Sequence, residues 1–346
     1  MLLPRIDVRH ATAWVIPMLL TAVAACDVGD QQATERSVIP AAQAAAAAVD
    51  SSGAQVELVR TIRTHARKEM KEASSAAASV AQPGVVFTIN DSGHDPWLFA
   101  LDSTGADRGV WSVNGATNRD WEALALGACA NADDTSGMEA GVPRCIYIGD
   151  VGDNDAKHAS LTLYRVREPA VLPPGRTGTL DAERVTFRYS DGRHDVEAMY
   201  VAADGAVFFI TKRPLKDAAG RARPALIFRL PLAAWSGGAV AIAELVDSLP
   251  IVPGSAPRRM ITDAALAPDR RRLVVRTYRQ LFTFAIDAET GLPRADVPPG
   301  VCNVRALDEK QGEGVTWWNS GRSLLLVSEG RKEPMLEVRC PMARAD

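Results

Sequence analysis

The sequence predicts an all-β protein, a β-propeller in which five four-stranded blades are the first choice and six remain open. Three observations predict it. Apolar strands led by an acid recur along the chain, each is followed by two further apolar strands, and the last unit lacks a strand that a segment near the start of the domain could supply. Repeated units of four short strands are typical of propeller blades.

The first strand of each unit begins with an acid followed by small and apolar residues. Consecutive acids are 50, 75, 66 and 50 residues apart, and the longer spacings contain insertions such as RPLKDAAGRARP. Units of this length fit four antiparallel strands each. The leading acids are Glu72, Glu122, Glu197, Asp263 and Glu313.

The second and third strands of each unit are apolar runs that end in polar residues or turns. The second strands are predicted over residues 85–91, 146–150, 207–212, 273–277 and 324–329. The third strands are predicted over residues 96–104, 161–169, 225–233, 280–288 and 335–343. A weaker fourth strand follows in most units, as in RGVWSVNG and RVTFRYSDG.

The ends of the domain suggest how the ring closes. The sequence stops after a third strand, and Ala54–Arg63 could be the missing outer strand, which would remove exposed sheet edges. A helix over Val56–Glu72 is the alternative. A sixth blade stays open because LVDSLPIVPGSAPRRM could contain a degenerate strand pair.

The N-terminal residues have the composition of a targeting segment. We expect residues 1–26 to be a lipoprotein signal peptide, residues 27–53 a flexible tether, and residues 54–346 the propeller domain. VAAC, Val23–Cys26, resembles a bacterial lipobox, whose cysteine is lipidated; an ordinary signal peptide with a chance cysteine is the alternative. The expected location is extracytoplasmic, on the periplasmic side or the cell surface, with membrane contact only through a lipid on Cys26.

Four further cysteines suit an oxidising compartment. We expect Cys129 to pair with Cys145 and Cys302 with Cys340. The net charge of −3 and the scattered Lys and Arg residues leave no basic footprint for nucleic acid. We expect a monomer whose ligand, a small molecule or a protein, the sequence does not name.

The innermost strand of a propeller blade lines the central channel, so the leading acids should converge at one channel mouth. A calcium ion would relieve their repulsion, because it accepts six to eight oxygen ligands in flexible geometry. Hydrogen bonds to backbone amides of a neighbouring blade are the purely structural alternative. The candidate metal ligands are Asp91, Asp120, Glu122, Asp150, Asp153, Asn154, Asp195, Glu197, Asp263 and Glu313.

Two functions compete, beside a scaffold without a ligand. The first is a binding module that holds a divalent cation and a ligand on the acidic face. The second is a metal-dependent hydrolase of a phosphoester, ester or lactone, although GxSxG, HExxH and P-loop motifs are absent from the sequence. In the hydrolase, Glu122, Glu197 or His94 would be the base, and Lys212 and Arg276 would bind the anion.

Several motifs together resemble a group of uncharacterised bacterial secreted propeller proteins, akin to the SdiA-regulated and esterase-like phytase propeller families. The resemblance covers roughly Glu69 to Pro341 and implies a propeller with an acidic channel face that calcium could occupy. The first unit departs from the pattern with EASSAAAS, and the fourth has Asp263 in place of Glu. IYIGDVGDN alone is not an EF-hand, since the twelfth residue from Asp150 is Leu161. The motifs are NDSG with LFALD, DWEALA, IYIGDVGDN, LYRVREP, DVEAM and SLLLVSEG.

Overall fold

The computed structural model describes residues 54–129, 144–253 and 259–340. The described residues all belong to one compact unit. The predicted signal peptide and tether therefore lie outside the described residues. Within the described residues, no helix is both long and apolar enough to cross a membrane.

The regular secondary structure of the described chain is almost entirely strand, and the strands pair antiparallel in groups of four. The first two groups are β3 (Ala73–Ala78), β4 (Val85–Asn90), β5 (Trp97–Asp102), β6 (Asp107–Asn114), then β7 (Trp121–Ala128), β8 (Arg144–Asp150), β9 (Leu161–Arg167), β11 (Glu183–Tyr189). The next two are β12 (Val196–Val201), β13 (Val207–Thr211), β16 (Leu226–Leu230), β17 (Ala241–Ser248), then β18 (Ile261–Leu266), β19 (Arg272–Thr277), β20 (Gln280–Ala285), β21 (Gly300–Asn303). The last group is β22 (Gly312–Trp318), β23 (Ser323–Ser328), β24 (Met335–Arg339) and β2 (Glu57–Ile62).

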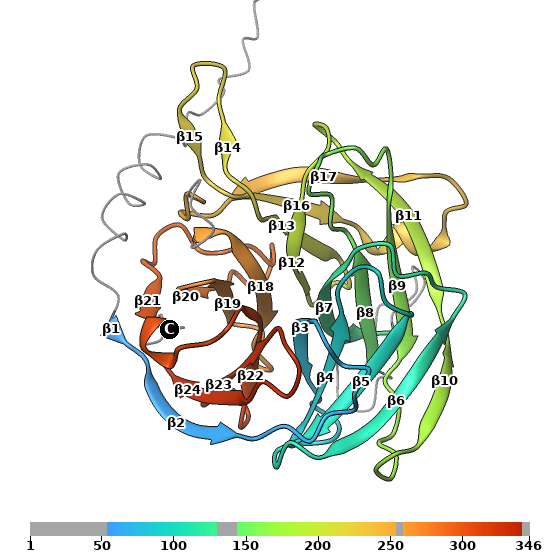
Figure 1. The fold of residues 1–346 in the computed structure, drawn as a ribbon. Helices are drawn as coiled ribbons and strands as arrows, with labels where there is room; N and C mark the ends of the chain where they lie inside the picture. The colour runs from blue at the N-terminus through green and yellow to red at the C-terminus, as the bar shows by residue number, and fades with distance from the viewer. Residues whose placement is uncertain (1–53, 130–143, 254–258, 341–346) are drawn as a thin grey trace, which may run out of the picture. The chain divides into compact units, whose positions relative to one another are not determined.

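The first strands of the groups form a closed ring around an axis (Figure 1). β3 contacts β7, β7 contacts β12, β12 contacts β18, β18 contacts β22, and β22 contacts β3. Each group extends outward from this ring, which is the arrangement of a β-propeller. The predicted all-β propeller class is therefore confirmed, and the acid-led strands are the innermost ones.

Apolar side chains fill the space between neighbouring groups. Between the first and second groups, Phe87 and Trp111 pack in one buried cluster with Trp121 and Tyr164. Four similar clusters occupy the other junctions around the ring. Because both faces of most strands are covered, runs such as VFFIT in β13 are buried throughout and show no alternation of polar residues.

Close approach between the innermost strands explains their small residues. A Cβ at Gly314 of β22 would lie 2.9 Å from the carbonyl carbon of Ser75 and 3.0 Å from the Cβ of Ala76, both in β3. Such distances are too short for ordinary contact, so this position requires glycine. The Ala, Ser and Gly residues of EASSAAAS and GEGVTWW are thus a packing requirement of the ring.

Outer strands of neighbouring groups are joined by parallel pairs. β1 (Ala54–Gln55) pairs with β21, β10 (Thr177–Asp181) pairs with β6, and β11 pairs with β17. β2 pairs antiparallel with β24, from Glu57 opposite Arg339 to Ile62 opposite Met335. The alternative of a helix over Val56–Glu72 is wrong, because this stretch is the strand β2 followed by irregular chain.

The insertions differ in structure. RPLKDAAGRARP forms a two-stranded hairpin of β14 (Leu215–Lys216) and β15 (Ala222–Arg223), which projects from the ring in Figure 1. The stretch considered for a sixth blade contains the end of β17, and its described residues after Ser248 form no strand; residues 254–258 lie outside the described part. Two short 3₁₀ helices, η1 (Leu232–Ser236) and η3 (Arg305–Leu307), occupy connections.

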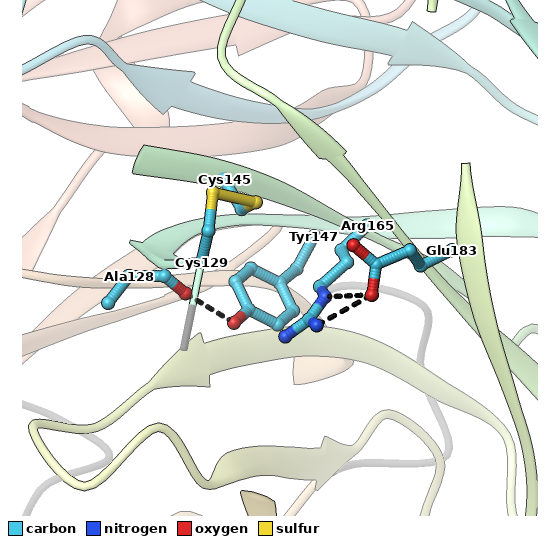
Figure 2. Close-up of a disulfide and its surroundings, with 6 residues drawn as sticks. All are labelled: Ala128, Cys129, Cys145, Tyr147, Arg165 and Glu183. Carbon is cyan, nitrogen blue, oxygen red and sulfur yellow. Dashed lines mark hydrogen bonds and ion pairs between the residues drawn. A yellow bond between two sulfur atoms is a disulfide. The ribbon is translucent and has the colours of Figure 1, made fainter. Parts of the chain in front are cut away.

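Both predicted disulfides are confirmed. Cys129 bonds to Cys145 and Cys302 bonds to Cys340, with Cα atoms 4.9 and 5.9 Å apart. Below the first bridge, the Tyr147 hydroxyl donates to the carbonyl of Ala128 at 2.6 Å (Figure 2). The first bridge ties the end of β7 to the start of β8, whereas the second ties β21 to the residue after β24 in the neighbouring group.

Candidate functional site: the acidic channel mouth

A β-bulge lies near the start of every innermost strand. The pairing with the second strand shifts by one residue at Glu122, Glu197, Thr262 and Glu313, and around Ser74 and Ser75 in β3. A bulge leaves a residue outside the ladder and changes the direction of its side chain. The glutamates of β7, β12 and β22 are all bulge residues, which explains why they face one mouth of the ring.

One small cavity of about 70 Å³ collects these side chains. This volume holds an ion with a few water molecules but not an organic molecule of ordinary size. Four of its acidic lining residues belong to the predicted set, and Glu72 and Glu329 add two more carboxylates. The cavity is lined by Glu72, Ala73, Ser74, Asp91, Glu122, Asn154, Glu197, Lys212, Tyr278, Gln311, Glu313 and Glu329.

The half of the mouth nearest β12 and β22 has internal partners for its acids. Lys212, at the end of β13, forms an ion pair with Glu197, and both side chains are nearly buried. Glu313 accepts hydrogen bonds from Gln311 Nε2 at 2.7 Å and from the Tyr278 hydroxyl at 3.2 Å. Burial raises the pKa of Glu313 to about 7, although the nearby Lys212 charge opposes the rise.

The other half, between the β4–β5 connection and β7, has few partners for three acids. One carboxylate oxygen from each of Asp91, Asp120 and Glu122 lies within 4.8 Å of the others. Ser74 donates to Glu122 Oε2 at 2.6 Å. Burial, reinforced by the charges of Asp91, Asp195 and Asp150, raises the pKa of Asp120 to about 7.

Glu122 is the most buried of these three acids. Burial is the largest cause that raises its pKa well above the ordinary value, and the charge of Asp91 adds to the rise. Lys212 and the Ser74 hydroxyl oppose it. Asp120 and Glu122, both with raised pKa values and both close to Asp91, therefore mark the part of the mouth that most needs an added positive charge.

This oxygen set fits a divalent cation. Two ligands on opposite sides of a calcium ion, each at about 2.3–2.6 Å, would be about 4.6–5.2 Å apart, which matches the observed spread. Hard carboxylate oxygens without nitrogen or sulfur ligands suit calcium or magnesium rather than zinc. Calcium tolerates the irregular arrangement of three carboxylates, with water or a ligand in the remaining positions.

The stretch IYIGDVGDN supports the site by shaping the backbone beside it. The Asp150 carboxylate accepts from the Asp120 amide at 2.7 Å. Asp153 accepts from the amides of Lys157 and His158 at 2.8 and 3.0 Å. Asp153 therefore acts as a turn acceptor, whereas Asp150 holds the backbone just before β7.

The second glycine of this stretch gives Asp120 its space. A Cβ at Gly152 would lie 2.4 Å from the carboxyl carbon of Asp120 and 2.9 Å from Glu122 Cγ. The next asparagine, Asn154, lines the cavity and its side-chain oxygen accepts from Arg213. The stretch therefore contributes one polar ligand candidate and the room for another.

Asp195 is held by groups outside the cavity. It accepts from the Asp153 amide at 3.0 Å and from Arg213 Nε at 2.6 Å. Its side chain is nearly buried. The structure thus brings Asp195 close to the mouth but occupies both of its oxygens.

Asp263 lies one residue beyond the bulge position of its strand, where Thr262 stands instead. Its carboxylate is fully buried and accepts from Ser75 Oγ at 2.9 Å and from the amides of Ala76, Ala264 and Val315 at 3.2, 2.8 and 2.8 Å. These donors belong to β3, β18 and β22. Asp263 therefore joins three innermost strands below the mouth and does not line the acidic cavity.

Arg276 and His94 are also displaced from the cavity. Arg276 is fully buried, with one nitrogen 2.6 Å from Glu309 Oε2 and another 2.7 Å from the Gly314 carbonyl. His94 does not line the acidic cavity, and its Nδ1 lies 3.0 Å from the Ser92 carbonyl and 3.4 Å from Glu72 Oε2. Of the five predicted catalytic residues, Glu122, Glu197 and Lys212 share the cavity.

Sequence reasoning missed Ser74, Tyr278 and Gln311. The alignment of the first unit on Glu72 obscured Ser74. The bulge of β3 gives Ser74 the position that Glu122 has in β7. Tyr278 follows β19, and only the packing of two neighbouring groups brings it to Glu313. Gln311 directly precedes β22 and reaches Glu313 from two residues away in the same segment. The Ser-Ser pair at an innermost bulge was the available signal for Ser74.

The opposite end of the ring has a different lining. A cavity of about 70 Å³ lies there among the later residues of the innermost strands. Its wall is mainly apolar, with Ala78, Leu126, Ala265 and Trp317, and two arginines, Arg144 and Arg270, at its edge. The concentration of carboxylates is thus specific to one mouth.

Comparisons with known proteins show no family for this chain. No protein-family model matches the chain, and no curated protein matches it. Among solved structures, it is similar to one described as "Structure of Dos1 propeller", at 11% sequence identity and a TM-score of 0.32. That match covers 74% of this chain and 52% of the other, so the chain spans about half the length of that structure. The β-propeller fold is assigned from the closed ring of innermost strands.

Proposed function

We propose that this chain is a lipid-anchored, extracytoplasmic β-propeller that binds calcium, and through it a ligand, at the acidic channel mouth. In this proposal each antiparallel group is one blade, so the ring has five blades and β2 closes the last one. The lipid is carried by Cys26, and the chain acts as a monomer.

A single observation carries the proposal: the asymmetric supply of positive charge at the mouth. Among the described residues that line the cavity, Lys212 is the one cation, and it pairs with Glu197. Asp91, Asp120 and Glu122 remain close together, and the donors that meet their carboxylates are uncharged: the Ser74 hydroxyl at Glu122 and the Ser92 amide at Asp91. A divalent cation at this trio would supply the missing charge.

The same mouth offers positions for a ligand. A cation held by three carboxylates retains open coordination positions, since calcium takes six to eight oxygens. Tyr278, Gln311 and Asn154 line the cavity beside it and can accept or donate hydrogen bonds. An oxygen-bearing ligand could therefore reach the cation from outside.

Thermal unfolding of the full chain in calcium and in EDTA tests the proposal. We expect calcium to raise the melting temperature, with a stabilisation of about 2.7 kcal/mol at a hundredfold excess over Kd. The variants Asp91→Asn and Glu122→Gln should lose the calcium response while still folding. Asp204→Asn, an exposed acid paired with Arg229 at the other end of β12, is the matched control.

A melting temperature independent of calcium in the unaltered protein would overturn the proposal. So would an unchanged calcium response in the variants of both Asp91 and Glu122. Isothermal titration of the metal-free chain with calcium and with magnesium identifies the preferred ion.

A metal-dependent hydrolase of a phosphoester, ester or lactone is the second candidate. It is favoured by the pKa of Asp120, about 7, which suits a general base at neutral pH. The cation would polarise the substrate, and Lys212 would face its negative charge. Metal-dependent turnover that is lost in Glu122→Gln, with calcium binding measured in parallel, would select this candidate.

A further inference from the structure

A second, larger cavity lies beside the acidic one, and three long cationic side chains line it. Its volume is about 550 Å³, within the range of small-molecule sites. Lys68 and Lys71 come from the segment before β3, and Arg331 comes from the β23–β24 connection. His94 and Trp97, from the loop after β4 and the start of β5, complete the wall.

The three long cationic side chains are available to a ligand. Within residues 54–129, 144–253 and 259–340, the side chains of Lys68, Lys71 and Arg331 have no hydrogen bond or ion pair. The cavity also contains Glu69, which lies 3.6 Å from Arg67 Nε, and the exposed Asp95. Positive charge therefore exceeds negative charge around the cavity, and part of the negative charge is already paired.

The backbone that presents these lysines is fixed by a buried amide. Asn90 is 2% exposed, and its side-chain oxygen accepts from the amides of Lys71 and Glu72 at 3.0 and 3.2 Å. Its side-chain nitrogen donates to the Glu69 carbonyl at 2.8 Å. The Lys71 carbonyl accepts from the Gly330 amide at 3.1 Å, which ties this segment to the connection that carries Arg331. The site is thus held in place before any ligand arrives.

The two cavities share a wall. Lys71 and Asn90 line the larger cavity, and the residues that follow them in the chain, Glu72 and Asp91, line the acidic one. His94 of the larger cavity lies 3.4 Å from Glu72 Oε2. A molecule in the larger cavity therefore lies directly beside the carboxylates proposed to hold calcium.

We propose that the larger cavity binds a small organic oxyanion, whose charged groups meet Lys68, Lys71 and Arg331 and whose body packs against Trp97. This inference rests on the proposed function in one respect: an oxygen of the same ligand completes the calcium coordination at Asp91. Carboxylate and phosphate groups share the required chemistry, because both accept charge-assisted hydrogen bonds from Lys and Arg.

Isothermal titration of the full chain with phenyl phosphate, isophthalate and uncharged benzamide tests this, first in EDTA and then in calcium. We expect at least one of the anions to bind and benzamide not to bind; the tighter anion identifies the preferred group. Lys71→Met and Arg331→Met should each weaken anion binding on the order of tenfold. Lys216→Met, an exposed lysine on the β14–β15 hairpin without an ion pair among the described residues, should leave it unchanged.

The two proposals fail in different ways. If neither anion binds in EDTA or in calcium, or if both variants bind the anions as the unaltered chain does, the oxyanion site is overturned even where calcium still stabilises the protein. Anion binding in EDTA that calcium does not strengthen would support the oxyanion site and overturn its link to the cation.

Discussion

Asp263 and Glu122 occupy neighbouring positions in the repeated innermost strand, one residue after the bulge and at the bulge itself. Both are buried, and burial raises the pKa of each well above its ordinary value. Yet Asp263 accepts from four donors on three strands, whereas Glu122 accepts from one serine and faces two other acids. A shift of one residue along the strand separates an acid that holds the ring together from an acid that faces the mouth.

The difference shows which acids are available to a ligand. Buried polar groups normally have hydrogen-bond partners. A carboxylate whose oxygens already accept hydrogen bonds from the protein has little remaining capacity to bind a ligand. Asp150, Asp153 and Asp195 resemble Asp263 in this respect, since backbone amides or Arg213 occupy their oxygens. Asp91, Asp120 and Glu122 differ because each lies close to two other carboxylates, although Asp91 accepts from the Ser92 amide and Glu122 from Ser74. The predictions below test that division.

The largest expected effect comes from removing Asp263. In Asp263→Ala, the amides of Ala76 and Val315 and the hydroxyl of Ser75 lose their buried acceptor, which should cost roughly 4–6 kcal/mol of unfolding free energy. Urea denaturation measures this loss. Asp263→Asn, which keeps one acceptor oxygen, should lose less, and the calcium response of the folded fraction should persist. A loss below about 1 kcal/mol would contradict the structural role of Asp263.

Removing the Lys212 charge should leave the buried carboxylate of Glu197 without its ion-pair partner. Lys212→Met leaves Glu197 buried without its partner, and we expect a loss of roughly 2–4 kcal/mol. The double variant Lys212→Met with Glu197→Gln should recover most of it. Because the mouth then carries more uncompensated negative charge, calcium should stabilise the single variant more than the unaltered chain. Equal calcium responses in thermal unfolding would contradict this.

Two acids near the mouth, Asp120 and Glu313, should make the stability of the metal-free protein depend on pH near neutrality. The pKa values of Asp120 and Glu313, about 7 in the folded protein, exceed the ordinary values of 3.8 and 4.5. The folded state therefore binds more protons than the unfolded state in this window, and stability falls as pH rises from about 5 to about 8, by roughly 2 kcal/mol after solvent screening.

Thermal unfolding across this pH range in EDTA measures the dependence. Asp120→Asn and Glu313→Gln should flatten it, because each removes a group that titrates in the window. Calcium should oppose the decline, since it binds the ionised carboxylates. Stability that rises with pH in EDTA would contradict the raised pKa values.

The smallest effect on stability, with a clear effect on binding, is expected for Gly152→Ala. The added Cβ would displace the Asp120 carboxylate from the trio, so calcium affinity should fall on the order of tenfold while stability changes by about 1 kcal/mol. Gly238→Ala is the matched control, because a Cβ there meets no atom within 4 Å. Calcium titration of both variants measures the difference, and equal affinities would show that Asp120 does not bind the ion.

The strand pattern could be predicted because each strand is a compact apolar run bounded by turns. The pairing of β2 with β24 could be anticipated from an unpaired strand at each end of the domain. The bulges could not, since they depend on the pairing with the second strand. Aligning the repeat on acids therefore placed Glu72 and Asp263 in positions that belong to Ser74 and Thr262.

The partners of the acids were also beyond sequence reasoning. Lys212 and Tyr278 reach the mouth from different groups, and only the contacts between neighbouring groups decide which acid each one meets. Arg276, like Lys212, is a cation near the end of a second strand, so the sequence predicted the same role for both. It turns instead to Glu309, over Gly312, where a Cβ would lie 1.6 Å from its guanidinium.

The pairing of β2 with β24 also has a consequence for the order of events in folding. Arg60 meets Glu337 across 277 positions of sequence, so the earliest described strands must wait until nearly all of the described chain is present. Contacts this distant in sequence slow folding and leave strand edges open in the meantime. A chaperone that shields β2 until β24 is available would therefore act while this strand edge is still unpaired.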